Sequence, residues 1–257
     1  MRNIDDLTKI PDFTDDVDEL IKRFEQALRD IQAELRALST TNMQRKELLE
    51  AQRVIRNRLS DITKYTEEWS ETRVEEAILG AIIAAKLAMG LAVIADELFS
   101  SKQRQFVTLS TDALISDITA VTQSIERQTN VAIRKMQVEA MRSTELTRSA
   151  VNDIIDGTDI AIIDRAGRRW KTQTYLDVLA NTSLMNAYRD AAVLEGLTSG
   201  NGLGQITSHP KTRDACLNHQ GKIVKLSPDV PGDYPYYRDL SHIWHPSCRH
   251  RIIPLHD

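Results

Sequence analysis

The sequence predicts a mostly α-helical protein with a small α+β module at its C-terminus: a long N-terminal helical arm or bundle, then a hairpin, a helix and short strands. Two observations predict this. Eight of the 10 glycines and six of the seven prolines lie at or after Gly157, and these residues mark turns and interrupt helices. Apolar residues before Gly157 instead recur every three or four positions, as one face of a helix requires. We therefore expect one domain over residues 1–156 and a second over residues 157–257.

The composition excludes several classes of protein. The 257 residues carry 33 basic and 37 acidic side chains, a net charge of −4, which argues against a uniformly basic nucleic-acid coat. Two cysteines cannot form a disulfide framework for a chain of this size. No apolar stretch follows the first basic residue, as it would in a secretory signal. These features predict synthesis and folding in a reducing cytoplasm.

The first two helices are predicted from their apolar spacing. Over residues 17–38 the apolar positions alternate four and three apart, which places them in one stripe of the kind found in bundles and coiled coils. Pro11 and the acidic run over residues 15–19 suit a helix start, because carboxylates favour the positive end of the helix dipole. A turn at residues 39–42 is expected to end this helix, and a second stripe follows over residues 48–69.

Two later helix starts are predicted from capping patterns. Residues 72–75 (Thr-Arg-Val-Glu) have the spacing of a capping box and are expected to open a third helix. Residues 110–112 (Ser-Thr-Asp) are expected to open a fourth helix, which runs to about Asn152. The stripes fit packing within one bundle or self-association with other subunits, and the sequence leaves both interpretations open.

The segment Ala77–Ala95 contains one charge, Lys86. Its 19 residues are about long enough to cross a bilayer core, but a central lysine offsets most of what the apolar residues gain. Gly80, Ala84 and Ala88 form a ladder of small residues that permits close helix contact. Two interpretations remain: a helix buried in a bundle or between subunits, and transient membrane contact. A constitutive membrane anchor is not expected.

The C-terminal module is expected to open with a hairpin and a helix. Residues 160–164 and 169–172 are predicted to pair as strands around a turn at Gly167. Residues 174–194 follow as an amphipathic helix, and the glycines of residues 196–204 are expected to form a flexible loop. Five side chains of the helix are predicted to face a core: Tyr175, Val178, Leu179, Leu184 and Tyr188.

Positive charge surrounds a tryptophan in the hairpin. Arg165, Arg168 and Arg169 lie close to Trp170 in the sequence, and cations beside an aromatic face can hold nucleic acid. A solvated hairpin whose tryptophan packs on the next helix explains the same residues without a ligand. DNA contact through the three arginines is therefore one of two interpretations.

All six histidines and both cysteines lie in the last 49 residues. The pairs Cys216/His219 and His245/Cys248 each have two intervening residues, a spacing at which one tight turn presents both side chains to a tetrahedral zinc. Cys248 and His250 are two apart and would share one face of a strand. The alternative is that ordinary surface histidines and two buried cysteines cluster without a metal.

Catalytic interpretations have less support. The HxE and PCxxC motifs of zinc deaminases and the HExxH motif are absent from the sequence. A thiol nucleophile would need an orienting acid and an oxyanion hole, which the neighbouring residues do not specify. A metal-dependent nuclease would need carboxylates that converge on the metal, and the nearby acids have no motif spacing. A metal-dependent nuclease or toxin and a DNA-binding module remain the alternative functions.

A resemblance to a known family covers residues 154–256. It rests on an ordered set of residues: Gly167-Arg168-Arg169-Trp170, Tyr175, His209, Arg213, Cys216, Gln220-Gly221-Lys222, His245-Pro246-Ser247-Cys248-Arg249-His250 and Pro254. In this order they resemble the minor capsid and head-morphogenesis proteins of tailed phages, combining features of the minor capsid protein 2 and Mu F-like groups. The sequence QGK, then HPxCRH, then proline is the specific part of the resemblance. Mu F-like members often carry cysteine at the positions of Arg213 and His250.

The resemblance implies a non-enzymatic minor structural protein of a phage particle. It would lie inside the head near the portal, contact portal and capsid proteins, and act in head assembly or DNA ejection. The resemblance also implies ligand positions for one structural zinc. Histidine can replace cysteine at zinc, whereas arginine cannot. The expected ligands are Cys216, Cys248 and His250, with His245 or His209 as the fourth and His219 less favoured.

Overall fold

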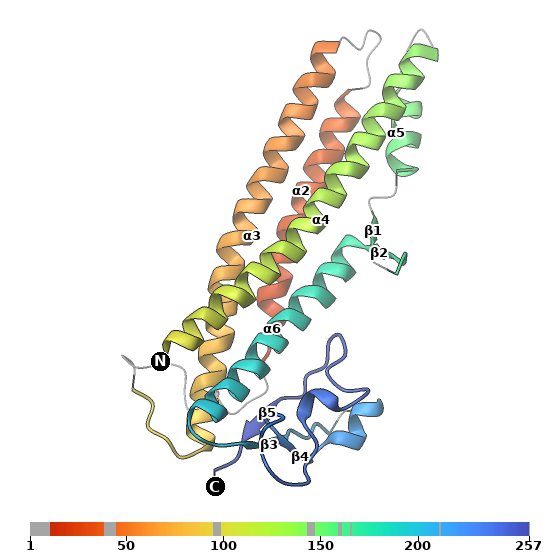
Figure 1. Cartoon of the computed structure of the whole chain (residues 1–257). Coiled ribbons are helices and arrows are strands. Elements are labelled where there is room, and N and C mark those ends of the chain that lie inside the picture. Colours follow the sequence, from red (N-terminus) through yellow and green to blue (C-terminus); the bar gives the residue numbers. More distant parts are fainter. Residues whose placement is uncertain are drawn as a thin grey trace. The chain divides into compact units, whose positions relative to one another are not determined.

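The computed structural model describes residues 11–38, 45–94, 99–142, 147–158, 161–164, 166–210 and 212–256. Within these ranges the protein is mostly helical with a small C-terminal α+β part, as predicted (Figure 1). Its α-helices there are α2 (Thr14–Ala37), α3 (Arg45–Ala88), α4 (Ser101–Arg142), α5 (Arg148–Asp156) and α6 (Thr172–Thr198). Its short elements are β1 (Ala161–Ile163), β2 (Arg169–Lys171), β3 (Leu203–Ile206), η2 (Ala215–His219), β4 (Ile223–Lys225), η3 (Tyr237–Asp239) and β5 (Ile252–Pro254).

The chain divides into two compact units. The helical unit comprises Asp15–Trp69 and Ile115–Asp177, and the C-terminal unit comprises Ser70–Leu114 and Val178–Asp257 together with the residues up to Thr14. Each unit therefore combines segments that are distant in the sequence. A domain boundary near Gly157 stays a prediction.

Helix α2 begins where the sequence predicts. The Asp12 side chain accepts hydrogen bonds from the Thr14 backbone N–H at 3.1 Å and from the Thr14 hydroxyl, and Asp15 and Asp16 occupy the first turn. Both features favour a helix N-terminus. The predicted apolar stripe is buried at Val17, Leu20, Ile21, Phe24, Ile31 and Leu35. The turn expected at residues 39–42 lies outside the described residues.

Helices α2 and α3 pack antiparallel within the helical unit. The Trp69 indole donates to the Asp16 carbonyl at 3.1 Å, and the Tyr65 hydroxyl donates to the Glu19 carboxylate at 3.0 Å. Later residues of α3 thus meet earlier residues of α2, so the directions are opposed. The α3 stripe is buried as well, at Ile55, Leu59, Ile62 and Trp69. These contacts support packing of α2 and α3 within one bundle.

The prediction that a third helix opens at residues 72–75 is wrong. Helix α3 runs without interruption from Arg45 to Ala88, because the Thr-x-x-Glu spacing also fits the interior of a helix and no proline breaks this stretch. Its one glycine, Gly80, costs a helix about 1 kcal/mol and does not end it.

The predicted start of the fourth helix at residues 110–112 is also wrong, because α4 begins at Ser101. A reciprocal capping box lies just before this start: the Ser100 N–H donates to the Gln103 side chain at 2.7 Å, and the Gln103 N–H donates to the Ser100 hydroxyl at 3.3 Å. The helix ends at Arg142, earlier than predicted. A separate helix, α5, starts at the Thr147 cap.

The described part of Ala77–Ala95 buries one face in the C-terminal unit, whereas Val93 and Ile94 are exposed. Successive turns of α3 bury Ala77, Ile78, Ala81, Ile82 and Ala85, and Met89 just after the helix is buried as well. Lys86 forms an ion pair, because its ammonium lies 3.4 Å from the Glu195 carboxylate of α6. No helix in the described ranges is both long and apolar enough to cross a membrane. Ala95 itself lies outside the described residues.

The hairpin and the following helix form as predicted. Strands β1 and β2 pair antiparallel, with Ile162 opposite Trp170, and Gly167 turns the chain at φ 77°. Within α6, Leu184 and Tyr188 are buried, whereas the other three predicted core residues are half-buried. The flexible loop predicted for residues 196–204 is wrong at both ends, because Gly196 belongs to α6 and Gly204 to β3.

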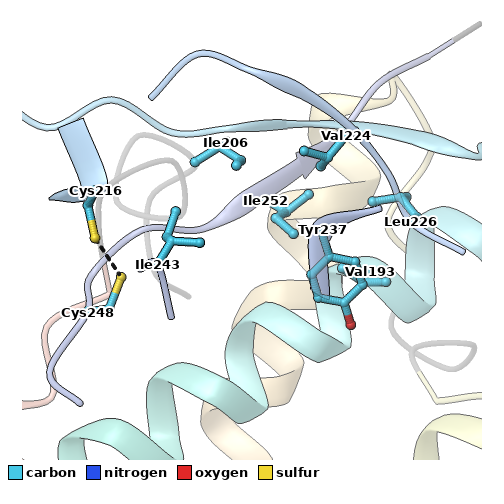
Figure 2. Close-up of a cluster of buried hydrophobic side chains, with 9 residues drawn as sticks. All are labelled: Val193, Ile206, Cys216, Val224, Leu226, Tyr237, Ile243, Cys248 and Ile252. Carbon is cyan, nitrogen blue, oxygen red and sulfur yellow. Dashed lines mark hydrogen bonds between the residues drawn. The ribbon is translucent and has the colours of Figure 1, made fainter. Parts of the chain in front are cut away.

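The C-terminal sheet has the order β4-β3-β5 with both pairings antiparallel. Its central strand contains Gly204, where a Cβ atom would lie 2.5 Å from the Ile252 side chain and 2.8 Å from Leu226. Only a glycine permits this close packing. One face of the sheet carries the hydrophobic cluster of Figure 2: Val193, Ile206, Cys216, Val224, Leu226, Tyr237, Ile243, Cys248 and Ile252.

Candidate metal centre

Two cysteines face each other at one end of the buried cluster (Figure 2). The sulfur atoms of Cys216 and Cys248 lie 3.9 Å apart, and both thiols are buried and free. Cys216 lies on η2, where the Asp214 carboxylate caps the turn by accepting the Cys216 backbone N–H at 3.0 Å. The fold thus brings together two thiols that lie 32 positions apart in the sequence and that no local pattern pairs.

Cys248 closes a tight turn that begins at His245, as the spacing predicted. The Cys248 N–H donates to the His245 carbonyl at 2.9 Å. His242, Trp244 and Ser247 have φ angles of 64°, 63° and 62°, a left-handed conformation that costs a non-glycine residue roughly 1–2 kcal/mol. Tertiary contacts must hold this loop in place.

Three such contacts are visible. The Trp244 indole donates to the Tyr237 carbonyl at 2.9 Å, the Arg189 guanidinium lies 4.5 Å from the Trp244 ring centroid, and the Ser247 N–H donates to the Thr182 hydroxyl at 3.0 Å. Arg189 and Thr182 belong to α6. The helix therefore positions the turn that carries Cys248.

His250 completes a triad with the two cysteines. Its Nδ1 atom lies 3.5 Å from the Cys248 sulfur, and its Nε2 atom lies 3.1 Å from the Gln220 amide. Cys248 and His250 precede strand β5, so the prediction that they share a strand is wrong, although they do lie together. Gln220, from the QGK sequence, orients the ring because it engages the nitrogen that faces away from the sulfurs.

Two of the three edges of this triad match one tetrahedral zinc. The ligand atoms of Cys216, Cys248 and His250 all lie within 4.8 Å of one another. With Zn–S bonds of about 2.3 Å and Zn–N bonds of about 2.0 Å, a tetrahedron has S···S edges of about 3.8 Å and S···N edges of about 3.5 Å. The observed 3.9 Å and 3.5 Å agree with these edges. Thiolate and imidazole donors select zinc over magnesium or calcium.

The electrostatics fit a ligand cluster better than a nucleophile. Burial, reinforced by neighbouring Cys248, raises the pKa of the Cys216 thiol to about 12, so the metal-free thiol is protonated at neutral pH and unreactive. Burial also lowers the pKa of His250 and of His209, which keeps both imidazoles neutral. Neutral imidazole is the form that binds a metal.

The remaining histidines differ in where the fold places them. His245 and Asp214 form a second triad with Cys216, again with ligand atoms within 4.8 Å. His209 packs edge-on against His250 at 4.7 Å between ring centroids, but its Nε2 lies 3.0 Å from the Arg249 carbonyl. His219 joins neither triad among the described residues, so the predicted Cys216/His219 pair does not form. The sequence did not single out Asp214 as a member of this cluster, because the acids near the cysteines have no motif spacing.

A cleft of about 770 Å³ opens onto this cluster. Its lining combines basic and metal-binding side chains, including His209, Arg213, His245, Cys248, Arg249 and His250. The cluster is therefore reachable from one side.

The basic hairpin is organised by one carboxylate. The Arg168 guanidinium lies 2.7 Å from Asp164 and 5.5 Å from the Trp170 ring centroid, and the Trp170 indole donates to the same carboxylate. Arg168 and Trp170, two of the residues predicted to contact nucleic acid, thus have partners inside the hairpin. This favours the solvated-hairpin interpretation. Arg165 lies outside the described residues.

Comparisons with known proteins identify a family model and one relative. The family model described as "Phage minor capsid protein 2" matches residues 14–255. A "Structural protein" of Lactococcus phage LL-H is 26% identical over 136 residues, which cover 48% of this chain and 37% of that protein. The chain thus matches little more than a third of that relative's length. No solved structure matches.

Proposed function

The chain belongs to the phage minor capsid protein 2 family, and from this premise we propose that it is a non-enzymatic structural protein of the phage head that acts in head assembly or DNA ejection. The observation that carries the proposal is the extent of the family match, residues 14–255. It includes the long helices as well as the C-terminal module, on which the sequence resemblance rested. The role therefore involves the whole chain.

The surface of α4 supports contact with other virion proteins. Val131, Val138 and Met141 are exposed by 41%, 46% and 86%, and their spacing of seven and three places them on one helical face. Large apolar side chains gathered on one exposed face are typical of protein interfaces. We propose that this face meets portal or capsid proteins, in a chain made in the host cytoplasm and packaged inside the head.

A conditional nonsense mutant of the phage gene tests this role. In a non-suppressing host, an assembly role predicts few DNA-filled heads by electron microscopy, whereas an ejection role predicts normal DNA-filled heads that adsorb but deliver little DNA. A full-length chain supplied in trans should restore either defect. Wild-type yield and infectivity without the chain would contradict both roles.

We also propose that one structural zinc joins the Cys216, Cys248 and His250 side chains. The support is the agreement between the atom spacings and tetrahedral edges, together with the chemistry of the donors. The segment after β3 contains short strands and 3-10 turns, and small irregular segments commonly need such a crosslink. Elemental analysis of full-length protein purified without chelator should find one zinc per chain. Metal well below one equivalent, with both thiols titratable in the native state, would contradict the proposal.

DNA and membrane contacts are not part of the proposed function. Arg168 and Trp170 both contact Asp164 within the hairpin, and the Trp170 ring also packs against Tyr175 of α6. The described part of Ala77–Ala95 buries one apolar face within the C-terminal unit. DNA contact through the hairpin arginines and transient membrane contact remain predictions. Gel-shift and liposome dye-release assays on the full chain test them.

A further inference from the structure

Asp214 and His245 lie on the exposed side of the cysteine–histidine cluster, and both face Cys216. Because Cys216 belongs to both triads, a metal bound between the sulfurs lies next to this pair. We propose that His245, through Nε2, is the fourth zinc ligand, so that the centre is closed and structural rather than open and catalytic. This inference rests on the zinc proposed above.

The hydrogen bonds of His245 leave the correct nitrogen for a metal. Its Nδ1 lies 2.8 Å from the Pro246 carbonyl, which accepts from the Nδ1–H, so Nε2 is the nitrogen that remains for a metal. Metal-binding histidines commonly donate their other ring N–H to a backbone carbonyl in this way. Nε2 lies 3.2 Å from the Asp214 carboxylate. Two acceptors at this distance need a cation between or beside them, either a proton or a metal.

His209 does not offer an equivalent nitrogen. Its Nε2 lies 3.0 Å from the Arg249 carbonyl and 3.1 Å from the Thr207 hydroxyl. Its ring nitrogens also belong to neither triad of closely spaced ligand atoms in the described part of the chain. Asp214 is already engaged as the cap of η2 through its other oxygen. His245 shares Cys216 with the proposed ligands but lies outside the group of Cys216, Cys248 and His250, so its side chain must turn to the metal and give up the contact with Asp214.

The backbone of the loop gives a second reason. His245 and Cys248 lie at the two ends of one hydrogen-bonded turn, and the left-handed residues Trp244 and Ser247 flank them. Metal bonds to both ends would fix this strained turn. Sparsely populated backbone conformations persist where the surrounding structure over-determines them.

The fourth ligand decides the chemistry of the centre. Catalytic zinc keeps one position for water or substrate, whereas structural zinc has four protein ligands. The cleft of about 770 Å³ opens onto the cluster and includes His245 in its lining. A water at the fourth position would give a hydrolytic site accessible from this cleft. His245 at that position excludes water and removes the nuclease alternative.

Cobalt substitution of the full-length protein tests this proposal. The chain is loaded with Co²⁺, and its visible absorption is recorded with and without azide, which binds open metal positions. We expect the wild-type spectrum to be tetrahedral and unchanged by azide. His245→Ala should respond to azide and bind cobalt more weakly, by more than the roughly 10–100-fold that loss of an outer-shell partner costs. The matched control His209→Ala should behave as wild type.

A second variant keeps the test informative if His245→Ala does not fold. His245→Cys offers a thiolate at the same position, so the ligands should change from two thiolates to three and the sulfur-to-cobalt charge-transfer band should grow by about half. An azide response of the wild type, or an unchanged His245→Cys spectrum, would overturn the assignment of His245 while leaving the zinc proposal intact. Failure of the wild type to bind cobalt would instead reject the zinc itself.

Discussion

Asp164 organises the hairpin at the scale of single residues. Its carboxylate accepts hydrogen bonds from the backbone N–H groups of Ala166 and Arg168, both at 2.9 Å, and from the Trp170 indole at 2.9 Å. The indole bond first, and then the Arg168 backbone N–H, lower the pKa of Asp164 to about 2. A carboxylate with a lowered pKa stabilises the folded state above its unfolded pKa, and this stabilisation is lost as the pH falls through the folded value.

We therefore expect the hairpin to lose stability as the pH falls from about 4 toward about 2. The Trp170 indole N–H resonance reports this, because its acceptor becomes protonated. Its shift should have a midpoint near 2, and Asp164→Asn should abolish the titration. A midpoint near the ordinary aspartate value in the wild-type protein would contradict the hydrogen-bonding account.

The thiol pair gives a prediction about stability. Cys216→Ser should abolish zinc binding and lower the free energy of unfolding by several kcal/mol, because binding energy at a structural zinc is folding energy. Thermal unfolding with and without a chelator measures both effects. The control His219→Ala should keep metal-dependent stability, since its ring joins neither triad in the described residues. Equal chelator sensitivity of wild type and Cys216→Ser would refute the prediction.

At the scale of elements, a buried ion pair explains the lysine in an otherwise apolar stretch of α3. The Glu195 side chain is only 4% exposed, and it accepts from Lys86, Gln103 and Ser199. These partners come from α3, α4 and the end of α6. Lys86, whose charge argues against membrane insertion, thus forms an ion pair between two helices.

Removing the two members of this pair should have unequal effects. Glu195→Leu leaves the Lys86 ammonium and the Gln103 amide without their acceptor and should cost about 3–5 kcal/mol. Lys86→Met leaves Glu195 with two neutral donors, and its side chain is 21% exposed, so the loss should be smaller. Urea unfolding of the two variants measures the difference. A larger loss for Lys86→Met would show that the carboxylate is not the centre of this network.

Two glycines in regular elements should respond in opposite directions to alanine. At Gly80 in α3 a Cβ would meet only the Tyr188 ring at an ordinary 3.8 Å, so Gly80→Ala should stabilise the helix by about 0.5–1 kcal/mol. At Gly204 in β3 a Cβ would overlap the Ile252 side chain, so Gly204→Ala should destabilise by about 1–3 kcal/mol. Thermal unfolding distinguishes them, and the same sign for both would contradict the packing described.

The helices were predictable where the signal is local. Apolar stripes identified α2 and α6, since helical periodicity needs only neighbouring residues. Capping was ambiguous, because Thr-x-x-Glu at residues 72–75 lies inside α3 while Ser-x-x-Gln at residues 100–103 opens α4. Both have the same spacing, so composition alone does not separate a helix start from a helix interior.

For the candidate metal centre, too, only the local part was predictable from the sequence. The spacing of His245 and Cys248 correctly implied a tight turn. The other side chains near Cys248 are brought there by the packing of η2 against the loop. Cys216 on η2 is 32 positions from Cys248, and no local pattern specifies a contact over that separation. His219 and Asp214 lie on either side of Cys216 in the sequence, yet only Asp214 faces the cluster.

At the scale of the whole molecule, both compact units are assembled from segments distant in sequence. Residues 70–114 contribute to the C-terminal unit through contacts such as Lys86 to Glu195. The family match over residues 14–255 includes segments of both units. This supports a role in which the helices and the module function together as one part of the particle.

Quantitative mass spectrometry of purified, DNA-filled particles tests the central claim most directly. We predict that peptides from both units are present at a fixed ratio to the portal protein and far below the ratio of the major capsid protein. They should persist after high-salt washing and nuclease treatment. Peptides abundant in infected cells but absent from the washed particles would contradict the assignment of this chain as a minor structural protein of the head.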